Sequence, residues 1–501
     1  MLKEKLDNYI KILLRGVSMK QKSIKKNFIY NLILTSTNMV FPLITAPYLS
    51  LILGAENIGK VNYATSMINW FVLFAAFGIP RYGIREIARN RDNKKNLSMS
   101  FWNLICIQIL LSLVAIVVYL IMILNIDYLG NDINLYLIMM LMIILSIFSI
   151  DWFYQGIEEY GYITIRNVIV KILSIVLIFI MVKYKEDYLI YATINILGLS
   201  FNNILNYINA KKYINKKIYK FKIIYYLKEL KIYFFTTLII AMYTSLDQVI
   251  VGNYSPKDLA YYIRSKNVQA IGMNITNSII TVFIPRTAYL VKKDYNEYKK
   301  VIQASINYIY ILALPCIVGI CFLSKEIMLL LGGKEFLPAT TSLQIISILI
   351  LINSVGGWQI NQILIPHRLE ELAFKIQTIG AIISFILNMI LVNKYSYIGA
   401  SWVWVITELF LAITVAIFIR KKCTNIKIQY LNKSLVKYLI SIILVALSIC
   451  IIKSLINNYI LIIIISILIC PVIYFGNIII LKDEIIMDMI YGIKNKIKVN
   501  K

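Results

Sequence analysis

Histidine, cysteine and acidic side chains are all scarce in this sequence of 501 residues. His367 is the only histidine, and its position just after an apolar run that ends near residue 365 favours a loop residue over a catalyst. The six cysteines show no Cys-x-x-Cys spacing and five of them lie in apolar runs, which predicts packing residues rather than disulfides or metal ligands. The sequence also contains no Walker loop and no cluster of metal-ligating side chains. These absences argue against the common hydrolase, nucleotidase and metalloenzyme classes.

The shortage of acidic residues leaves a strongly basic chain. There are 25 Asp and Glu against 52 Lys and Arg, a formal net charge of +27. Such a charge could indicate nucleic-acid binding, but 59% of the residues are hydrophobic and the basic residues lie in short clusters between apolar runs. The sequence therefore predicts a multi-pass membrane protein that contacts membrane lipid and binds no nucleic acid.

Apolar runs of spanning length predict an all-α fold of about 14 transmembrane helices. A window of about 19 residues places these spans near 28–53, 60–79, 101–124, 134–155, 167–182, 189–209, 232–252, 263–284, 302–323, 341–365, 376–393, 399–419, 438–453 and 459–481.

The distribution of Lys and Arg predicts the orientation in the membrane. The termini and the even-numbered loops carry 41 of them, and the odd-numbered loops carry 10. Because Lys and Arg accumulate in cytoplasmic loops, both termini are expected to be cytoplasmic. The densest basic loop, 211–231, contains eight lysines, which suit an anionic leaflet better than a nucleic acid.

An internal repeat with an offset near 200 residues predicts two similar lobes. Leu51-Ile52-Leu53-Gly54 recurs as Val249-Ile250-Val251-Gly252, and Ile79-Pro80-Arg81 recurs as Ile284-Pro285-Arg286. The repeat predicts two pseudo-symmetric six-helix lobes and two peripheral C-terminal helices. The expected segments are an N-terminal segment 1–27, an N-lobe 28–209, a basic linker 210–231, a C-lobe 232–419, a loop 420–437, two helices within 438–481 and a tail 482–501.

Polar residues at helical spacing indicate which spans face water. Asn31, Thr35, Asn38, Pro42 and Thr45 form one stripe on the first span. The second and eighth spans carry similar residues, among them Asn69, Asn274 and Asn277. We interpret the stripes as walls of a polar cavity, with hydrogen-bonded contacts between helices as the alternative.

Asp247 and Glu408 are acidic residues inside predicted spans. Asp247 lies in the seventh span and Glu408 near the middle of the twelfth. A charge at the membrane centre costs about 2.5 to 3.5 kcal/mol, so such residues are candidates for a proton or Na⁺ coupling site. The alternative is a structural ion pair with Lys171 or Lys375.

Several segments resemble one family of membrane transporters. They are Asp151-Trp152-Phe153-Tyr154-Gln155-Gly156-Ile157-Glu158, continuing to Arg166, together with Phe41 to Ser50, Leu53-Gly54-Ala55-Glu56 and Tyr82 to Ala88. In these segments the chain resembles the Wzx-type oligosaccharide flippases of the multidrug/oligosaccharidyl-lipid/polysaccharide exporter superfamily. It departs from the family at Leu51, where members usually carry Arg.

The resemblance implies a function and a set of partners. It implies alternating-access flipping of undecaprenyl-pyrophosphate-linked oligosaccharide across the bacterial cytoplasmic membrane, for capsule, O-antigen or other surface polysaccharide. It also implies a polysaccharide polymerase and glycosyltransferases as partners, with no cofactor beyond a coupling H⁺ or Na⁺. Asp151, Trp152, Gln155 and Glu158 form the polar cluster of the family motif.

The implied pyrophosphate needs cations at the cytoplasmic face. Arg81 and Arg286 follow the repeated Ile-Pro pair, and Arg85 and Arg264 are taken as supporting cations. We expect these four arginines to hold the pyrophosphate, with a role as positive-inside anchors as the alternative.

Two other functions stay open at this point. Another exporter of the superfamily, moving drugs or the lipid-linked peptidoglycan precursor, would present a similar cavity. A membrane enzyme such as a polysaccharide polymerase or ligase would need a sizeable outer loop, whereas the longest one predicted is 324–340.

Overall fold

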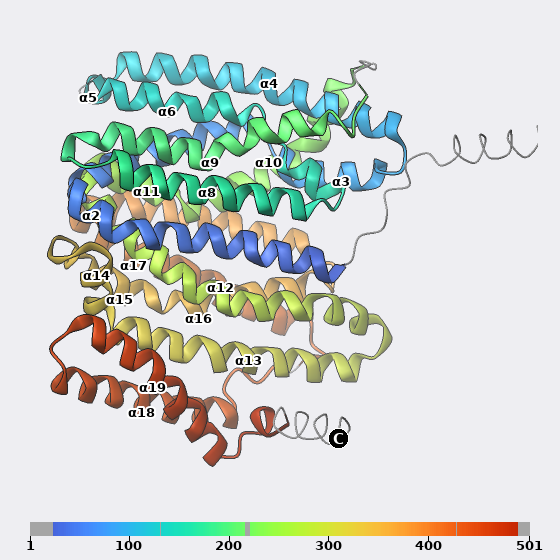
Figure 1. The fold of residues 1–501 in the computed structure, drawn as a ribbon. Coiled ribbons are helices and arrows are strands. Elements are labelled where there is room, and N and C mark those ends of the chain that lie inside the picture. The colour runs from blue at the N-terminus through green and yellow to red at the C-terminus, as the bar shows by residue number, and fades with distance from the viewer. Residues whose placement is uncertain (1–23, 131, 216–220, 427, 489–501) are drawn as a thin grey trace, which may run out of the picture. The chain divides into compact units, whose positions relative to one another are not determined.

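A computed structural model describes residues 24–130, 132–215, 221–426 and 428–488. Within these ranges every regular element is helical, which confirms the all-α membrane fold (Figure 1). The principal helices are α2 (Ile24–Ala76), α3 (Ile79–Asn90), α4 (Lys94–Asn125), α6 (Ile133–Ser146), α7 (Asp151–Gly156), α8 (Tyr160–Met181), α9 (Tyr188–Ala210), α10 (Ile223–Thr244), α11 (Leu246–Tyr254), α12 (Pro256–Lys293), α13 (Tyr295–Phe322), α14 (Ser324–Gly332), α15 (Ala339–Ser347), α16 (Leu349–Gln359), α17 (Glu370–Lys422), α18 (Lys433–Leu455) and α19 (Tyr459–Ile480).

Two helices are too long to cross a membrane once. At 1.5 Å per residue, the 53 residues of α2 extend about 80 Å, against a hydrocarbon core of about 30 Å. The backbone of α2 leaves helical geometry at Gly54, whose φ of 72° is a conformation that glycine adopts without steric cost. Ser396, with a φ of 47°, interrupts α17 in the same way. Each long helix therefore contains two of the predicted spans.

The number of spanning helices is consistent with the prediction without fixing it at fourteen. In the described part of the chain, 11 helices are long and apolar enough to cross a membrane, and the bent pair α10 and α11 makes up to 12. Because α2 and α17 each contain two predicted spans, this count is consistent with fourteen.

Three segments predicted as loops are helical. The loop expected after the second span forms the amphipathic helix α3, which buries Ile79, Tyr82 and Ile87. The segment expected as the longest outer loop, 324–340, contains α14. α10 begins at Ile223, inside the expected basic loop 211–231, of which 216–220 lie outside the described residues. Short amphipathic helices escape a test that looks only for apolar runs of spanning length.

The chain divides into two compact units. Unit 1 comprises 1–41 and 64–238, and unit 2 comprises 42–63 and 239–501. The boundaries fall inside α2 and α10, so the expected linker 210–231 lies within unit 1.

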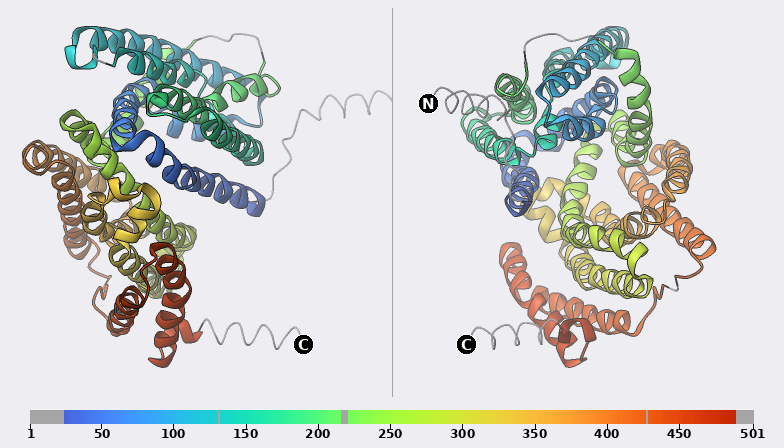
Figure 2. Two further views of the ribbon diagram at one scale, coloured as in Figure 1. Left: turned by 60° about the vertical axis from the view of Figure 1, so that its left-hand side comes forward. Right: turned by 90° about the vertical axis from the view of Figure 1, so that its right-hand side faces the viewer.

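Each unit has its own apolar core. In unit 1, Phe101, Trp152, Phe153 and Tyr154 form a buried aromatic cluster. In unit 2 the core surrounds α13 and includes Trp358, and α18 and α19 pack against each other and against α13 (Figure 2).

Candidate functional site

A buried charged cluster lies in unit 2 where α10 and α11 meet. The two helices are bent by 42° at Ser245, and Asp247 occupies the first turn of α11. Carboxylates are favoured in the first turn because the unpaired backbone N–H groups of a helix start give it partial positive charge. The Gln248 backbone N–H donates to Asp247 Oδ1 at 2.8 Å. The break thus places an acid inside the membrane-spanning part of the chain with local backbone support.

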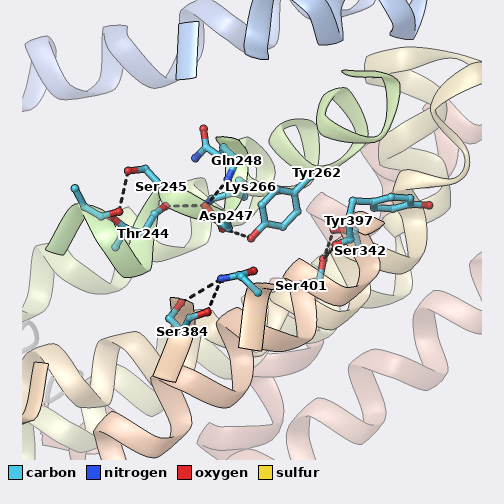
Figure 3. Close-up of polar contacts among 12 residues, drawn as sticks. Thr244, Ser245, Asp247, Gln248, Tyr262, Lys266, Ser342, Ser384, Tyr397 and Ser401 are labelled. Carbon is cyan, nitrogen blue, oxygen red and sulfur yellow. Dashed lines mark hydrogen bonds and ion pairs between the residues drawn. The ribbon is translucent and has the colours of Figure 1, made fainter. Parts of the chain in front are cut away.

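Two side chains of α12 complete the surroundings of Asp247 (Figure 3). The Tyr262 hydroxyl donates to Asp247 Oδ2 at 2.5 Å, and Lys266 Nζ approaches the same oxygen at 3.0 Å. Tyr262 and Lys266 are four residues apart and so share one face of the helix. Asp247 is 3% exposed. The carboxylate therefore meets an internal cation and two other donors.

Lys266 also contacts groups from two other helices. Its Nζ donates to the Thr244 carbonyl oxygen at 2.9 Å, at the end of α10. It lies 4.3 Å from the ring centroid of Trp404 in α17 and 4.9 Å from that of Tyr262. An aromatic face attracts a cation electrostatically. The ammonium is thus enclosed by two oxygens and two rings.

The second acid of the cluster, Glu408, lies one turn after Trp404 on α17. Its partly buried carboxyl interacts electrostatically with the Trp404 indole and with the Lys266 ammonium. Among the described residues, Trp404 Nε1 is buried without an acceptor at hydrogen-bonding distance, and the ion pair of Lys266 is with Asp247. Asp247 and Glu408 therefore share one lysine but differ in how completely they are paired.

The lysine partners expected from sequence are wrong. Lys375 pairs with the exposed Glu371 at 2.8 Å. Lys171 is buried in unit 1, where its Nζ lies 4.4 Å from the centroid of the Phe41 ring. The true partner, Lys266, stands three residues inside the predicted span 263–284, and this position is the sequence signal that could have identified it.

Arg264 and Arg286 lie at opposite ends of α12. Arg264 is buried, donates to the Leu331 carbonyl oxygen and, at 3.0 Å, to Ser50 Oγ, and lies over the Phe336 ring. Arg286 is exposed and pairs with Glu297 at 2.7 Å. Twenty-two helical residues separate the two arginines by about 33 Å. The structure therefore does not bring them together around one pyrophosphate.

Arg81 and Arg85 lie one turn apart on the exposed face of α3. Arg85 donates to the Tyr233 hydroxyl at 2.7 Å, within unit 1, whereas Arg81 makes no ion pair with a described residue. Of the four asparagines expected at a cavity, Asn38 and Asn69 are exposed in unit 1 and Asn274 and Asn277 are partly exposed in unit 2.

The family-motif cluster connects three helices of unit 1. Asp151 Oδ1 accepts from Arg166 Nη2 at 3.3 Å and from Asn206 Nδ2 at 2.5 Å. Trp152 is buried in the aromatic core, Gln155 is partly buried, and Glu158 pairs with Arg91 at 2.7 Å. These contacts join α7, α8 and α9 and give Asp151 and Glu158 structural partners.

Beside this motif, Tyr213 follows α9. Burial and the neighbouring Glu159 carboxylate raise the pKa of Tyr213 to about 12, so its hydroxyl stays protonated and donates to Glu159 at 3.3 Å.

The helices define a multi-pass membrane protein that carries a charged cluster within its spans. The structure is similar to that of the lipid II flippase MurJ in its inward closed conformation, with a TM-score of 0.69, 16% identity, and coverage of 90% of this chain and 99% of that chain. It is also similar to an inward-facing multidrug resistance MATE family transporter, with a TM-score of 0.57, 12% identity, and coverage of 81% and 96%.

The sequence comparison gives the family. The model of the family described as polysaccharide biosynthesis protein matches residues 24–291, more than half of the chain, and the chain belongs to this family. It is 22% identical over 411 residues to the protein named "Putative O-antigen transporter" in Escherichia coli (strain K12), covering 79% of this chain and 97% of that protein. These findings confirm the expected family resemblance and the expected fold, and the relative and the structures compared above are named as transporters or flippases.

Proposed function

We propose that this polysaccharide flippase moves undecaprenyl-pyrophosphate-linked oligosaccharide repeat units across the bacterial cytoplasmic membrane by alternating access. The observation that carries the proposal is the family match over 24–291 together with the MurJ-like fold. A glycan polymerase and glycosyltransferases would be its partners in surface polysaccharide assembly. A drug or peptidoglycan-precursor exporter is the second candidate, because the MATE and MurJ folds are both similar to this one.

The pyrophosphate would be held by arginine. Arg81 and Arg85 project from the exposed face of α3, one turn apart, and Arg286 is exposed near the end of α12. Planar guanidinium groups bind phosphate through two parallel hydrogen bonds, which lysine cannot do. Arg264 would stabilise the packing of unit 2 and not bind the pyrophosphate, because its guanidinium is buried against the Leu331 carbonyl and Ser50.

The sugars would meet the amides of the polar stripes. Asn38 and Asn69 are exposed, and Asn274 and Asn277 are partly so. Amide groups both donate and accept, so they can exchange hydrogen bonds with sugar hydroxyls. Pro42 and Pro47 lie within α2 and remove backbone hydrogen bonds there, which suits a helix that bends during the transport cycle.

The test is complementation of a flippase-deficient strain. The double variant Arg81→Lys and Arg286→Lys keeps the positive charge and loses the bidentate geometry, so surface polysaccharide should fall at least about tenfold. Arg89→Lys is the matched control, because Arg89 is exposed on the same helix α3.

Protein level and topology are measured for all variants. Full polysaccharide output from the double variant would remove Arg81 and Arg286 from the substrate site. Failure of the wild-type chain to complement any glycan-flipping defect, with the protein correctly inserted, would contradict the proposed function itself.

A further inference from the structure

The oxygens around Lys266 form the kind of ligand set that a metal cation would use. The Thr244 carbonyl and the Asp247 carboxylate both face the ammonium, at 2.9 Å and 3.0 Å. Carbonyl and carboxylate oxygens are the groups that hard cations bind in proteins. Here a tethered side chain occupies that position, and the Trp404 and Tyr262 rings cover two of its sides.

The cluster carries an unbalanced charge. Two carboxylates and one ammonium leave one net negative charge when all three are ionised. Among the described residues of the elements that pack against Lys266, the titratable groups that face it are Asp247 of α11 and Glu408 of α17, with Tyr262 of α12 beside them. The addition of one proton makes the cluster neutral. Protonation is favoured because an unbalanced charge in a poorly solvated site is unfavourable.

The two acids are not equivalent acceptors for that proton. The ionised form of Asp247 is held by the Lys266 ammonium, the Tyr262 hydroxyl and the Gln248 backbone N–H. Glu408 is outside the ion pair and neighbours the Trp404 N–H, which has no acceptor at hydrogen-bonding distance in the described residues. Glu408 is therefore the acid that can gain and lose a proton without breaking the Asp247–Lys266 ion pair.

We infer that Lys266 is a built-in counter-ion that closes the Asp247 site to Na⁺ and makes Glu408 a single-proton site for coupling. In the step, a proton from water forms an O–H bond on the Glu408 carboxylate and the cluster changes from one negative charge to neutral. The reverse step returns the proton to water. This inference rests on the proposed function for its role in transport, but the ion selectivity is a property of the purified protein.

The first experiment measures the unfolding temperature of the purified full chain in detergent, in NaCl and in choline chloride of equal concentration. The wild type should unfold at the same temperature in both. Lys266→Met vacates the cation position and should gain about 2 °C or more in NaCl. The double variant Lys266→Met with Asp247→Asn should lose that gain.

Two results would overturn the inference. In the first, NaCl stabilises the wild type but not the Asp247→Asn variant, which would show that a Na⁺ site exists beside Lys266. The other is a Lys266→Met variant without any response to NaCl, because the ammonium would then not fill a cation position. Neither result uses a glycan, so neither bears on whether the protein is a flippase.

The second experiment follows protonation through the neighbouring indole. The fluorescence of Trp404 is obtained as the difference between the wild type and Trp404→Phe. This difference should follow a one-proton titration between about pH 5 and pH 9. The Glu408→Gln substitution should remove the pH dependence. A difference that is flat with pH, or that still titrates in Glu408→Gln, would contradict the assignment of the proton to Glu408.

Discussion

Gly78 offers a direct test of how the arginine-bearing helix is positioned. It precedes α3 with a φ of 77°, and a Cβ there would lie 2.6 Å from the Phe234 backbone nitrogen and 2.9 Å from the Tyr233 carbonyl carbon. Left-handed geometry costs an L-residue about 1 to 2 kcal/mol. The backbone at Tyr233 and Phe234 must also shift to relieve the clash, which costs about a further 1 to 3 kcal/mol. Gly78→Ala should therefore destabilise the protein by about 2 to 5 kcal/mol.

The assay is the unfolding temperature in detergent, together with polysaccharide output in cells. Gly78→Ala should unfold several degrees lower and reduce output, because movement of α3 displaces Arg81 and Arg85. Gly319→Ala is the control, because no heavy atom lies within 4 Å of a Cβ there and alanine favours a helix by about 1 kcal/mol. A Gly78→Ala variant as stable as wild type would refute the reasoning about this close approach.

Three further predictions concern topology and charge. In a cysteine-free background, single cysteines in loop 211–231 should resist an impermeant thiol reagent in intact cells, and those in 125–134 should react; the reverse pattern would invert the topology. Glu408→Gln should leave the protein inserted but abolish the dependence of flipping on the proton gradient, and unchanged gradient dependence would make Glu408 structural. Lys171→Met should raise the unfolding temperature, since Lys171 is buried without an ion-pair partner in the described residues, and a marked loss of stability would reveal an anion beside it.

The apolar runs predicted most of the fold because a membrane span needs length and hydrophobicity alone. The sequence did not reveal that spans merge into α2 and α17, because these joins depend on single backbone conformations at Gly54 and Ser396. Helix α3 was predicted as a loop because it is too short and too basic for a hydropathy window.

The candidate site was only half predictable. The cost of burying charge identified Asp247 and Glu408, and the same argument could have identified Lys266 inside its predicted span. No residue pattern, however, specifies that the helices which carry these three residues pack together. The separation of Arg264 from Arg286 could have been worked out, because 22 residues on one predicted helix already place them at opposite ends.

The most direct measurement of the central claim is glycan translocation by the purified protein in vesicles that contain undecaprenyl-pyrophosphate-linked oligosaccharide. A glycan-cleaving enzyme that cannot enter the vesicles reports how much substrate crosses the bilayer. The account predicts translocation by the wild type and by Arg89→Lys, and its loss in the Arg81→Lys and Arg286→Lys double variant. Absence of translocation by correctly folded wild-type protein, with transport of a drug cation in the same vesicles, would contradict the claim.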